Sequence, residues 1–163
     1  MIILNFSKFH CQLYLTSTNN QIEVLRYYRK HMGKKFFIKI VSDPEIDLRK
    51  CVVGLACASQ AIVDGHEVSM FFASNGVKIL NSDYLDSINS GGIVPEGMVI
   101  GMMKSIIDGA NVIYCSTGSQ AANGVSKENA GDMLLDGYAD WMTWSGPSGV
   151  IELSAASDVQ LVY

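Results

Sequence analysis

Charge is scarce in this chain. Of its 163 residues only 17% are charged, whereas 48% are hydrophobic, and the mean hydropathy is +0.20. Lys and Arg number 12 against 16 Asp and Glu, and no basic cluster lies in the body of the chain. Nucleic acid is therefore not expected as a partner, because binding its phosphate backbone requires a positive face. The apolar excess predicts self-association into a homo-oligomer.

Long hydrophobic runs and cofactor motifs are missing as well. No apolar run is long enough to cross a bilayer, so no membrane association is expected. The three histidines are scattered, which argues against a metal site. No Gly-x-Gly-x-x-Gly follows a strand, and no Walker-type lysine loop is present. The loop Ser42-Asp43-Pro44-Glu45 after the first strand brings acidic charge and a proline without an N–H, which oppose phosphate. We therefore expect no nucleotide, flavin or other cofactor.

The cysteines do not form a recognisable metal or redox motif. They lie at positions 11, 51, 57 and 115, without a Cys-x-x-Cys pair or a zinc-finger spacing. The amino-terminal stretch lacks the features of a secretory signal. We therefore expect free thiols in a reducing, cytoplasmic compartment.

Strand and helix patterns alternate along most of the chain. Near-continuous apolar runs predict strands at residues 35–41, 66–72, 112–115, 139–144 and 159–163. Apolar residues at three-to-four spacing, with cap and glycine signals, predict helices at 46–64, 95–110, 127–135 and 147–157. This alternation predicts an α/β protein with a Rossmann-like, doubly wound, mostly parallel five-stranded sheet and helices on both faces.

Two segments fall outside this alternation. Residues 1–33 mix scattered aromatics with polar residues, so we expect a domain at residues 34–163 preceded by an extension. That extension could be mobile or loosely docked, could be translated upstream sequence if Met32 is the true start, or could be an arm swapped onto a neighbouring subunit. Residues 81–92 are polar and end in Gly-Gly, which predicts a loop, with a mobile flap over the crevice as one option.

Cys115 is the best candidate for chemistry. It ends the strand predicted at 112–115, just where the chain turns into small polar residues. Ligands of open parallel sheets bind in the crevice beyond the carboxyl ends of the strands, so this cysteine is placed at the right edge. The alternative is that Cys115 is a small apolar packing residue, as free cysteines usually are.

No histidine is placed to activate this thiol, because His66 lies at the opposite edge of the predicted sheet. The loop after Cys115 offers another means of activation, since main-chain N–H groups at the start of a helical turn lower the pKa of a thiol. The residues of this thiolate-stabilising loop are Ser116, Thr117, Gly118, Ser119 and Gln120. A nucleophilic thiol without a base suits exchange at sulfur.

These features together resemble the DsrE/DsrF-like family of sulfur-relay proteins, which includes the TusD-type subunits. The resemblance covers residues 34–163. It rests on the order and spacing of the segments Asp64-Gly65-His66-Glu67-Val68, Phe71-Phe72, Gly76–Leu80 and Val112–Cys115, with Ser119 and Gly124 behind the cysteine. It implies a Rossmann-like fold that assembles into trimers or hexamers. It also implies that Cys115 takes sulfane sulfur from a donor protein as a persulfide and passes it to an acceptor protein, as a sulfurtransferase does.

Two rival functions remain open at this stage. One is a non-enzymatic, oligomeric binding module of the same fold, with Cys115 as a packing residue. The other is a thiol redox sensor that forms a sulfenic acid at Cys115. Cys51, near the start of the first helix, is a candidate resolving thiol, whereas Cys57 is expected in the core and Cys11 has no assigned role.

Overall fold

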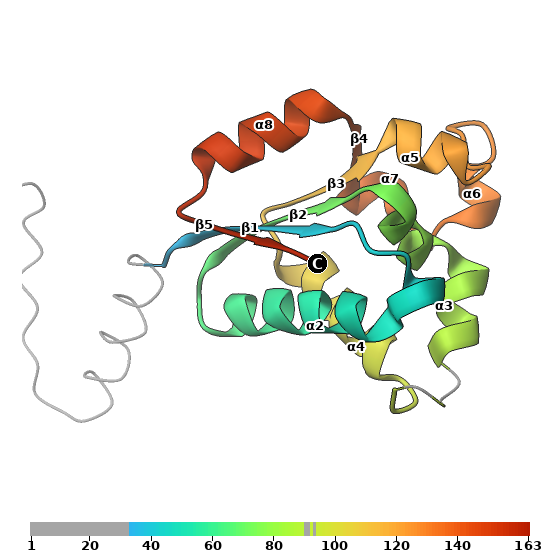
Figure 1. Ribbon diagram of the computed structural model, residues 1–163, viewed down its shortest axis with the longest axis horizontal. Coiled ribbons are helices and arrows are strands. Elements are labelled where there is room, and N and C mark those ends of the chain that lie inside the picture. The colour runs from blue at the N-terminus through green and yellow to red at the C-terminus, as the bar shows by residue number, and fades with distance from the viewer. Residues whose placement is uncertain (1–32, 90–91, 93) are drawn as a thin grey trace, which may run out of the picture. The chain divides into compact units, whose positions relative to one another are not determined.

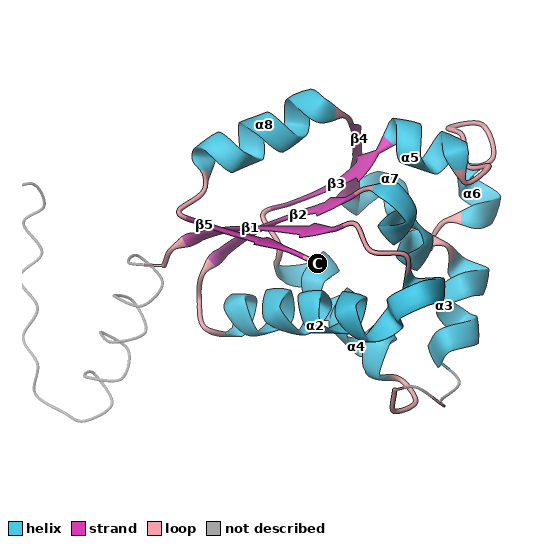
Figure 2. Ribbon diagram, viewed as in Figure 1, coloured by secondary structure: helices cyan, strands magenta, loops and turns pink. Residues whose placement is uncertain are grey.

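Five strands alternate with helices in the part of the chain that the structure describes (Figures 1 and 2). The structure is a computed structural model, and it describes residues 33–89, 92 and 94–163. Residues 1–32 lie outside the described residues, so the three hypotheses on the extension at residues 1–33 stay predictions. The strands are β1 (Lys35–Ile40), β2 (Glu67–Phe72), β3 (Val112–Ser116), β4 (Met142–Ser145) and β5 (Val159–Val162). The longer helices are α2 (Pro44–Val63), α3 (Ser82–Asn89), α4 (Met98–Gly109) and α8 (Pro147–Ala156).

The strands form one sheet in the order β4-β3-β2-β1-β5, and all four pairings are parallel. The predicted five-stranded, Rossmann-like sheet is therefore confirmed. Because β1 lies between β2 and β5, the chain moves outward through β2, β3 and β4 and then returns by α8 to the other side of β1. This path brings the loops that follow β1, β2 and β3 side by side at one edge.

Helices cover both faces of the sheet (Figure 1), and each face has its own core. Helices α2 and α4 lie against one face, where the larger core includes Ile38, Leu55, Met70 and Met103, all of them buried. Helix α8 lies against the other face, where Phe37 and Phe71 pack with Leu153. Strands covered on both faces need apolar residues at every position, which explains their continuous apolar runs.

Helix α2 begins where the sequence predicts. Asp43 is its N-cap, and the Asp43 carboxylate accepts a hydrogen bond from the N–H of Glu45 at 3.0 Å. Pro44 follows at the first helical position, where a missing N–H costs nothing. The helix bends early, because Asp47 has non-helical torsion angles, and it ends before Gly65, which has a φ of 81°.

The prediction of a loop at residues 81–92 is wrong for most of that segment. Residues Ser82–Asn89 form α3 instead. The side chain of Asn81 accepts a hydrogen bond from the N–H of Tyr84 at 3.0 Å, which starts the helix, and Leu85 is fully buried. The asparagine cap followed by an apolar residue was a usable signal that the polar composition obscured.

The connection between β3 and β4 also differs from the sequence prediction. It contains three short helices: α5 (Thr117–Ala122), α6 (Ala130–Met133) and α7 (Tyr138–Trp141). The helix predicted at 127–135 is present only as the shorter α6, and α7 replaces the first half of the strand predicted at 139–144. Strand β4 begins only at Met142. A second short segment, the 3-10 helix η1 (Ser74–Leu80), follows β2. Both η1 and α5 stand directly above the carboxyl edge of the sheet.

Candidate functional site at the carboxyl edge

The loops after β1, β2 and β3 are hydrogen-bonded to one another at the carboxyl edge. The N–H of Ala73, just past β2, donates to the carbonyl oxygen of Ile40 at 3.0 Å. The N–H of Ser74 donates to Oγ of Ser119 at 2.8 Å, which ties η1 to α5. The three loops therefore form one continuous surface at the edge where open α/β sheets bind ligands.

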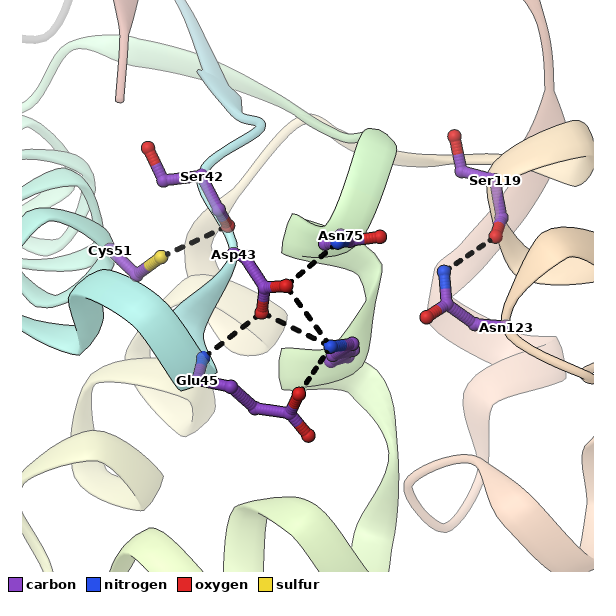
Figure 3. Close-up of polar contacts among 8 residues, drawn as sticks. Ser42, Asp43, Glu45, Cys51, Asn75, Ser119 and Asn123 are labelled. Atoms are coloured by element: carbon purple, nitrogen blue, oxygen red, sulfur yellow. Dashed lines mark hydrogen bonds and ion pairs between the residues drawn. The ribbon is translucent and has the colours of Figure 1, made fainter.

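The polar centre of this surface is an ion-pair network around Asp43 (Figure 3). Nζ of Lys78, from η1, lies 3.1 Å from both carboxylate oxygens of Asp43 and 2.6 Å from Oε2 of Glu45. Nδ2 of Asn75 donates to Asp43 at 2.7 Å. The Asp43 and Lys78 side chains are largely buried, whereas Glu45 is exposed. The network binds the start of α2 to the segment after β2.

This network shifts the pKa values of both partners. Burial alone raises the pKa of Asp43, but hydrogen bonds from the Glu45 N–H, Lys78 and Asn75 outweigh it and hold that pKa below its usual range. The hydrogen bond to Glu45 raises the pKa of Lys78 against the opposing effect of burial. Both groups are therefore charged at neutral pH. With two carboxylates against one ammonium, the cluster does not attract anions.

Replacing Asp43 should destabilise the fold in a pH-dependent way. Asp43→Ala removes the N-cap of α2 and leaves Lys78 with fewer partners, so we expect a loss of about 1–2 kcal/mol in the free energy of unfolding at pH 7. Because the pKa of Asp43 is lowered on folding, its carboxylate stabilises the fold fully above the unfolded pKa of about 3.9. That contribution disappears as the pH falls through the folded pKa. Urea unfolding of the wild type and of Asp43→Asn should therefore differ more at pH 7 than at pH 3; an equal difference at both would contradict this account.

Cys115 lies where the sequence places it, at the carboxyl end of β3, but its side chain faces inward. Ile113 and Cys115 point into the larger core, whereas Val112 and Tyr114 face α8. The exposed fraction of Cys115 is 0%. Helix α5 begins immediately after the strand. In this conformation no molecule in solvent touches the sulfur.

The expected lowering of the Cys115 pKa is wrong in this conformation. Burial raises the pKa of the thiol to about 12, and the side chain of Gln120 opposes this only in part. Desolvation disfavours a thiolate strongly, and it is the largest influence on the pKa of this thiol. Cys115 is therefore a neutral thiol at physiological pH.

Two residues of the predicted thiolate-stabilising loop, Ser116 and Ser119, hydrogen-bond to each other. Oγ of Ser116 caps α5 by accepting from the N–H of Ser119 at 3.2 Å and from its hydroxyl at 2.9 Å. Thr117 and Gly118 are exposed. Of the five loop residues, Gln120 is the one whose side chain acts on the pKa of Cys115.

Gln120 is unusual because it is a buried polar residue whose side-chain NH₂ group has no hydrogen-bond partner among the described residues. Its exposed fraction is 1%, and it is the one buried polar residue in the described part of the chain. Its Nε2 makes no hydrogen bond to any described residue, so its contact with the Cys115 sulfur falls short of proper hydrogen-bond geometry. An unpaired buried donor costs about 1–3 kcal/mol.

Removing this donor should stabilise the protein. Gln120→Met keeps the length of the side chain and eliminates the unpaired NH₂ group, so we expect the free energy of unfolding to rise by about 1 kcal/mol. Gln120→Glu keeps the shape but buries a carboxyl group, and should lower it instead. Thermal or urea unfolding measures both. If Gln120→Met unfolds more easily than the wild type, Nε2 has a partner that this account lacks.

The other cysteines divide into one buried and one accessible thiol. Cys51 is fully buried, and its Sγ donates to the carbonyl oxygen of Ser42 at 3.4 Å (Figure 3). Burial, followed by the charges of Asp47 and Asp43, raises its pKa to about 11. The resolving role of Cys51 remains a prediction.

Cys57 is not in the core as expected: it is half-buried, and the hydroxyl of Tyr163 donates to its Sγ at 3.2 Å. Cys11 lies outside the described residues.

The described residues contain neither a candidate metal site nor a candidate membrane-spanning helix. Within 33–89, 92 and 94–163, no three His, Cys, Asp or Glu side chains gather closely enough to hold a metal ion. Over the same residues, no helix combines the length and apolar character that a bilayer crossing requires.

Comparison with known proteins identifies the fold. The crystal structure of the ychN protein from E. coli superposes on 81% of this chain and on 100% of its own, with a TM-score of 0.52 and 12% sequence identity. At this identity the likeness shows a shared α/β fold. No protein-family model matches the sequence, and no curated protein matches it.

Proposed function

We propose that this chain is a non-enzymatic binding module of the DsrE-like fold, in which Cys115 is a packing residue. The observation that carries this proposal is the sulfur itself, which is fully buried in the larger core and has a pKa raised to about 12. At pH 7 such a thiol is neutral, whereas a free cysteine is ionised to a few per cent. The module binds its partner through the polar surface formed by the loops after β1, β2 and β3.

Sulfur uptake tests this proposal. The full chain is incubated with glutathione persulfide, and the intact mass of the native protein is compared with that of Cys115→Ser. In protein diluted to a monomer, both should gain the same amount of sulfur, because the buried Cys115 does not react and the half-buried Cys57 does. Cys57→Ser serves as the matched control and should gain less than the wild type. A gain that disappears in Cys115→Ser alone would overturn the proposal.

The second candidate is a sulfur carrier, and the unpaired Nε2 of Gln120 favours it. The step is attack of the Cys115 thiolate on the sulfane sulfur of a donor persulfide, which forms a Cys115 persulfide and releases the donor thiolate. The added sulfur would give Nε2 of Gln120 an acceptor. Donor and acceptor proteins then meet the site at the carboxyl edge. This function requires α5 to move away from the sulfur, so that uptake is slow and limited by opening.

A redox-sensing thiol faces the same barrier. Peroxide also reacts with the thiolate, and the buried, neutral Cys115 does not supply one. Dimedone labelling of peroxide-treated protein separates this possibility from sulfur transfer, because it traps a sulfenic acid and not a persulfide.

A further inference from the structure

The outer face of α2 carries apolar side chains that no described residue covers. Val53 and Val63 are exposed to 51% and 74%, and Ala56 and Gln60 are exposed between them. These positions recur at spacings of three and four residues, so they share one side of the helix. Cys57, half-buried, borders the same side. Val53, Ala56 and Val63 therefore form a narrow apolar strip along the solvent side of the helix, interrupted by the polar Gln60.

Opposite charges stand at the two ends of this strip. Arg49 and Lys50 are exposed near its amino-terminal end, and Asp64 caps its carboxyl-terminal end. Neither basic residue forms a salt bridge with a described residue. Asp64 accepts a hydrogen bond from Gln60 at 3.1 Å and has no cationic partner among the described residues. Asp47 also lies near this end, where its carboxylate accepts a hydrogen bond from the N–H of Lys50 at 3.1 Å. Its negative charge offsets one of the two cations, so Arg49, Lys50 and Asp47 together carry one net positive charge.

We propose that this face binds a second copy of the chain, with the two α2 helices antiparallel about a twofold axis. An antiparallel copy brings the basic end of each strip to the acidic end of the other, which makes the surface complementary to itself. The same arrangement places Arg49 and Lys50 beside the negative end of the partner helix dipole. This inference concerns a surface remote from Cys115 and holds whether or not that residue carries sulfur.

The register follows from the charges. Placing Arg49 opposite the partner's Asp64 also places Val53 opposite the partner's Gln60 and Ala56 opposite the partner's Cys57. The twofold axis then passes between residues 56 and 57. Small side chains at that point let two helix axes approach to about 8 Å, the close end of helix packing.

Tyr163 packs against α2 beside this face. The ring of Tyr163 packs against α2 so closely that a Cβ on Gly54 would lie 2.8 Å from it. The Tyr163 hydroxyl holds Sγ of Cys57, and the Tyr163 carbonyl accepts hydrogen bonds from Val41 and Ser42 at 2.7 and 3.1 Å. A twofold contact of this kind gives a dimer or the dimeric contact of a hexamer, and it does not by itself give a trimer.

Charge reversal tests the interface in the full chain. Sedimentation equilibrium should show self-association of the wild type. Arg49→Glu and Asp64→Arg should each weaken the association constant about tenfold, because each change creates two like-charge contacts in every dimer. The double variant Arg49→Glu/Asp64→Arg should restore it, since the charges are again complementary. Circular dichroism melts confirm that each variant folds.

Cross-linking tests the register independently. In a Cys11→Ser background, a short bis-maleimide should join two chains through Cys57, and the covalent dimer should disappear in Cys57→Ser. A monomeric wild type would overturn the proposal and leave the face to residues 1–33 or to another protein. Association that is unaffected by the single reversals, or not restored by the double one, would place the interface elsewhere. Sulfur uptake by Cys115 is measured separately, so failure here leaves the proposed function standing, and the reverse also holds.

Discussion

Cys115 in the native protein should react with iodoacetamide at least about a thousandfold more slowly than in urea. The sulfur has no exposed surface, so the reagent reaches it only after a local or global opening. An opening free energy of about 4 kcal/mol, at the low end of what a folded core requires, gives this factor. Mass spectrometry of alkylated peptides over time measures the rate.

The other cysteines provide the internal controls. Cys51, equally buried, should be protected to a similar degree, whereas the half-buried Cys57 should react within the range of an ordinary thiol when the protein is diluted to a monomer. If Cys115 reacts as fast as Cys57 in the native state, the site is open in solution. In that case the sulfur-carrier function becomes the better supported of the two.

Gly76→Ala should lower the free energy of unfolding by about 3 kcal/mol, which is roughly 10 °C in Tm for a domain of this size. A Cβ on Gly76 would lie 2.6 Å from the carbonyl oxygen of Ile40 and 2.8 Å from its carbonyl carbon. These are backbone atoms at the end of a central strand, so they cannot rotate away as a side chain could. The displaced η1 would also pull Asn75 and Lys78 away from Asp43.

Gly101→Ala is the matched control for this substitution. Gly101 lies in α4, and nothing stands within 4 Å of the position that its Cβ would take. Alanine is the better helix former by about 0.5–1 kcal/mol, so this variant should be slightly more stable than the wild type. Equal losses in the two variants would mean that close approach of the backbone at Gly76 is not the cause.

The fold was predictable because two independent patterns agree. Continuous apolar strands imply a sheet covered on both faces, and their alternation with helices implies parallel crossovers of one hand. Capping at Asp43 and the glycine after Asp64 fixed the ends of α2. Prediction failed where elements are short: α3 and the three helices between β3 and β4 bury few residues each, so their apolar periodicity is weak.

The environment of Cys115 could not be predicted in the same way. In a strand buried on both faces every residue is apolar, so the sequence does not reveal which face a side chain points to. The position at the end of β3 was correct, and it favoured an open crevice. Whether the sulfur meets solvent depends on how α5 covers it, and that is decided by tertiary packing.

The partner of Asp43 was missed for a related reason. Lys78 follows β2 and Asp43 follows β1, 35 residues apart. Their contact depends on the neighbouring positions of these strands in the sheet and on the 3-10 conformation of η1. Once the strand order is assumed, a lysine in the loop beside two carboxylates becomes a signal that the sequence does contain.

The pH dependence of Cys115 alkylation, measured in a protein with Cys11, Cys51 and Cys57 replaced by serine, shows whether this thiol is neutral or activated. The account predicts a rate that rises with pH without an inflection below about pH 10, because burial holds the thiol in its neutral form. An inflection at or below about pH 8.5, the value of a free cysteine, would show an activated thiolate and contradict the account.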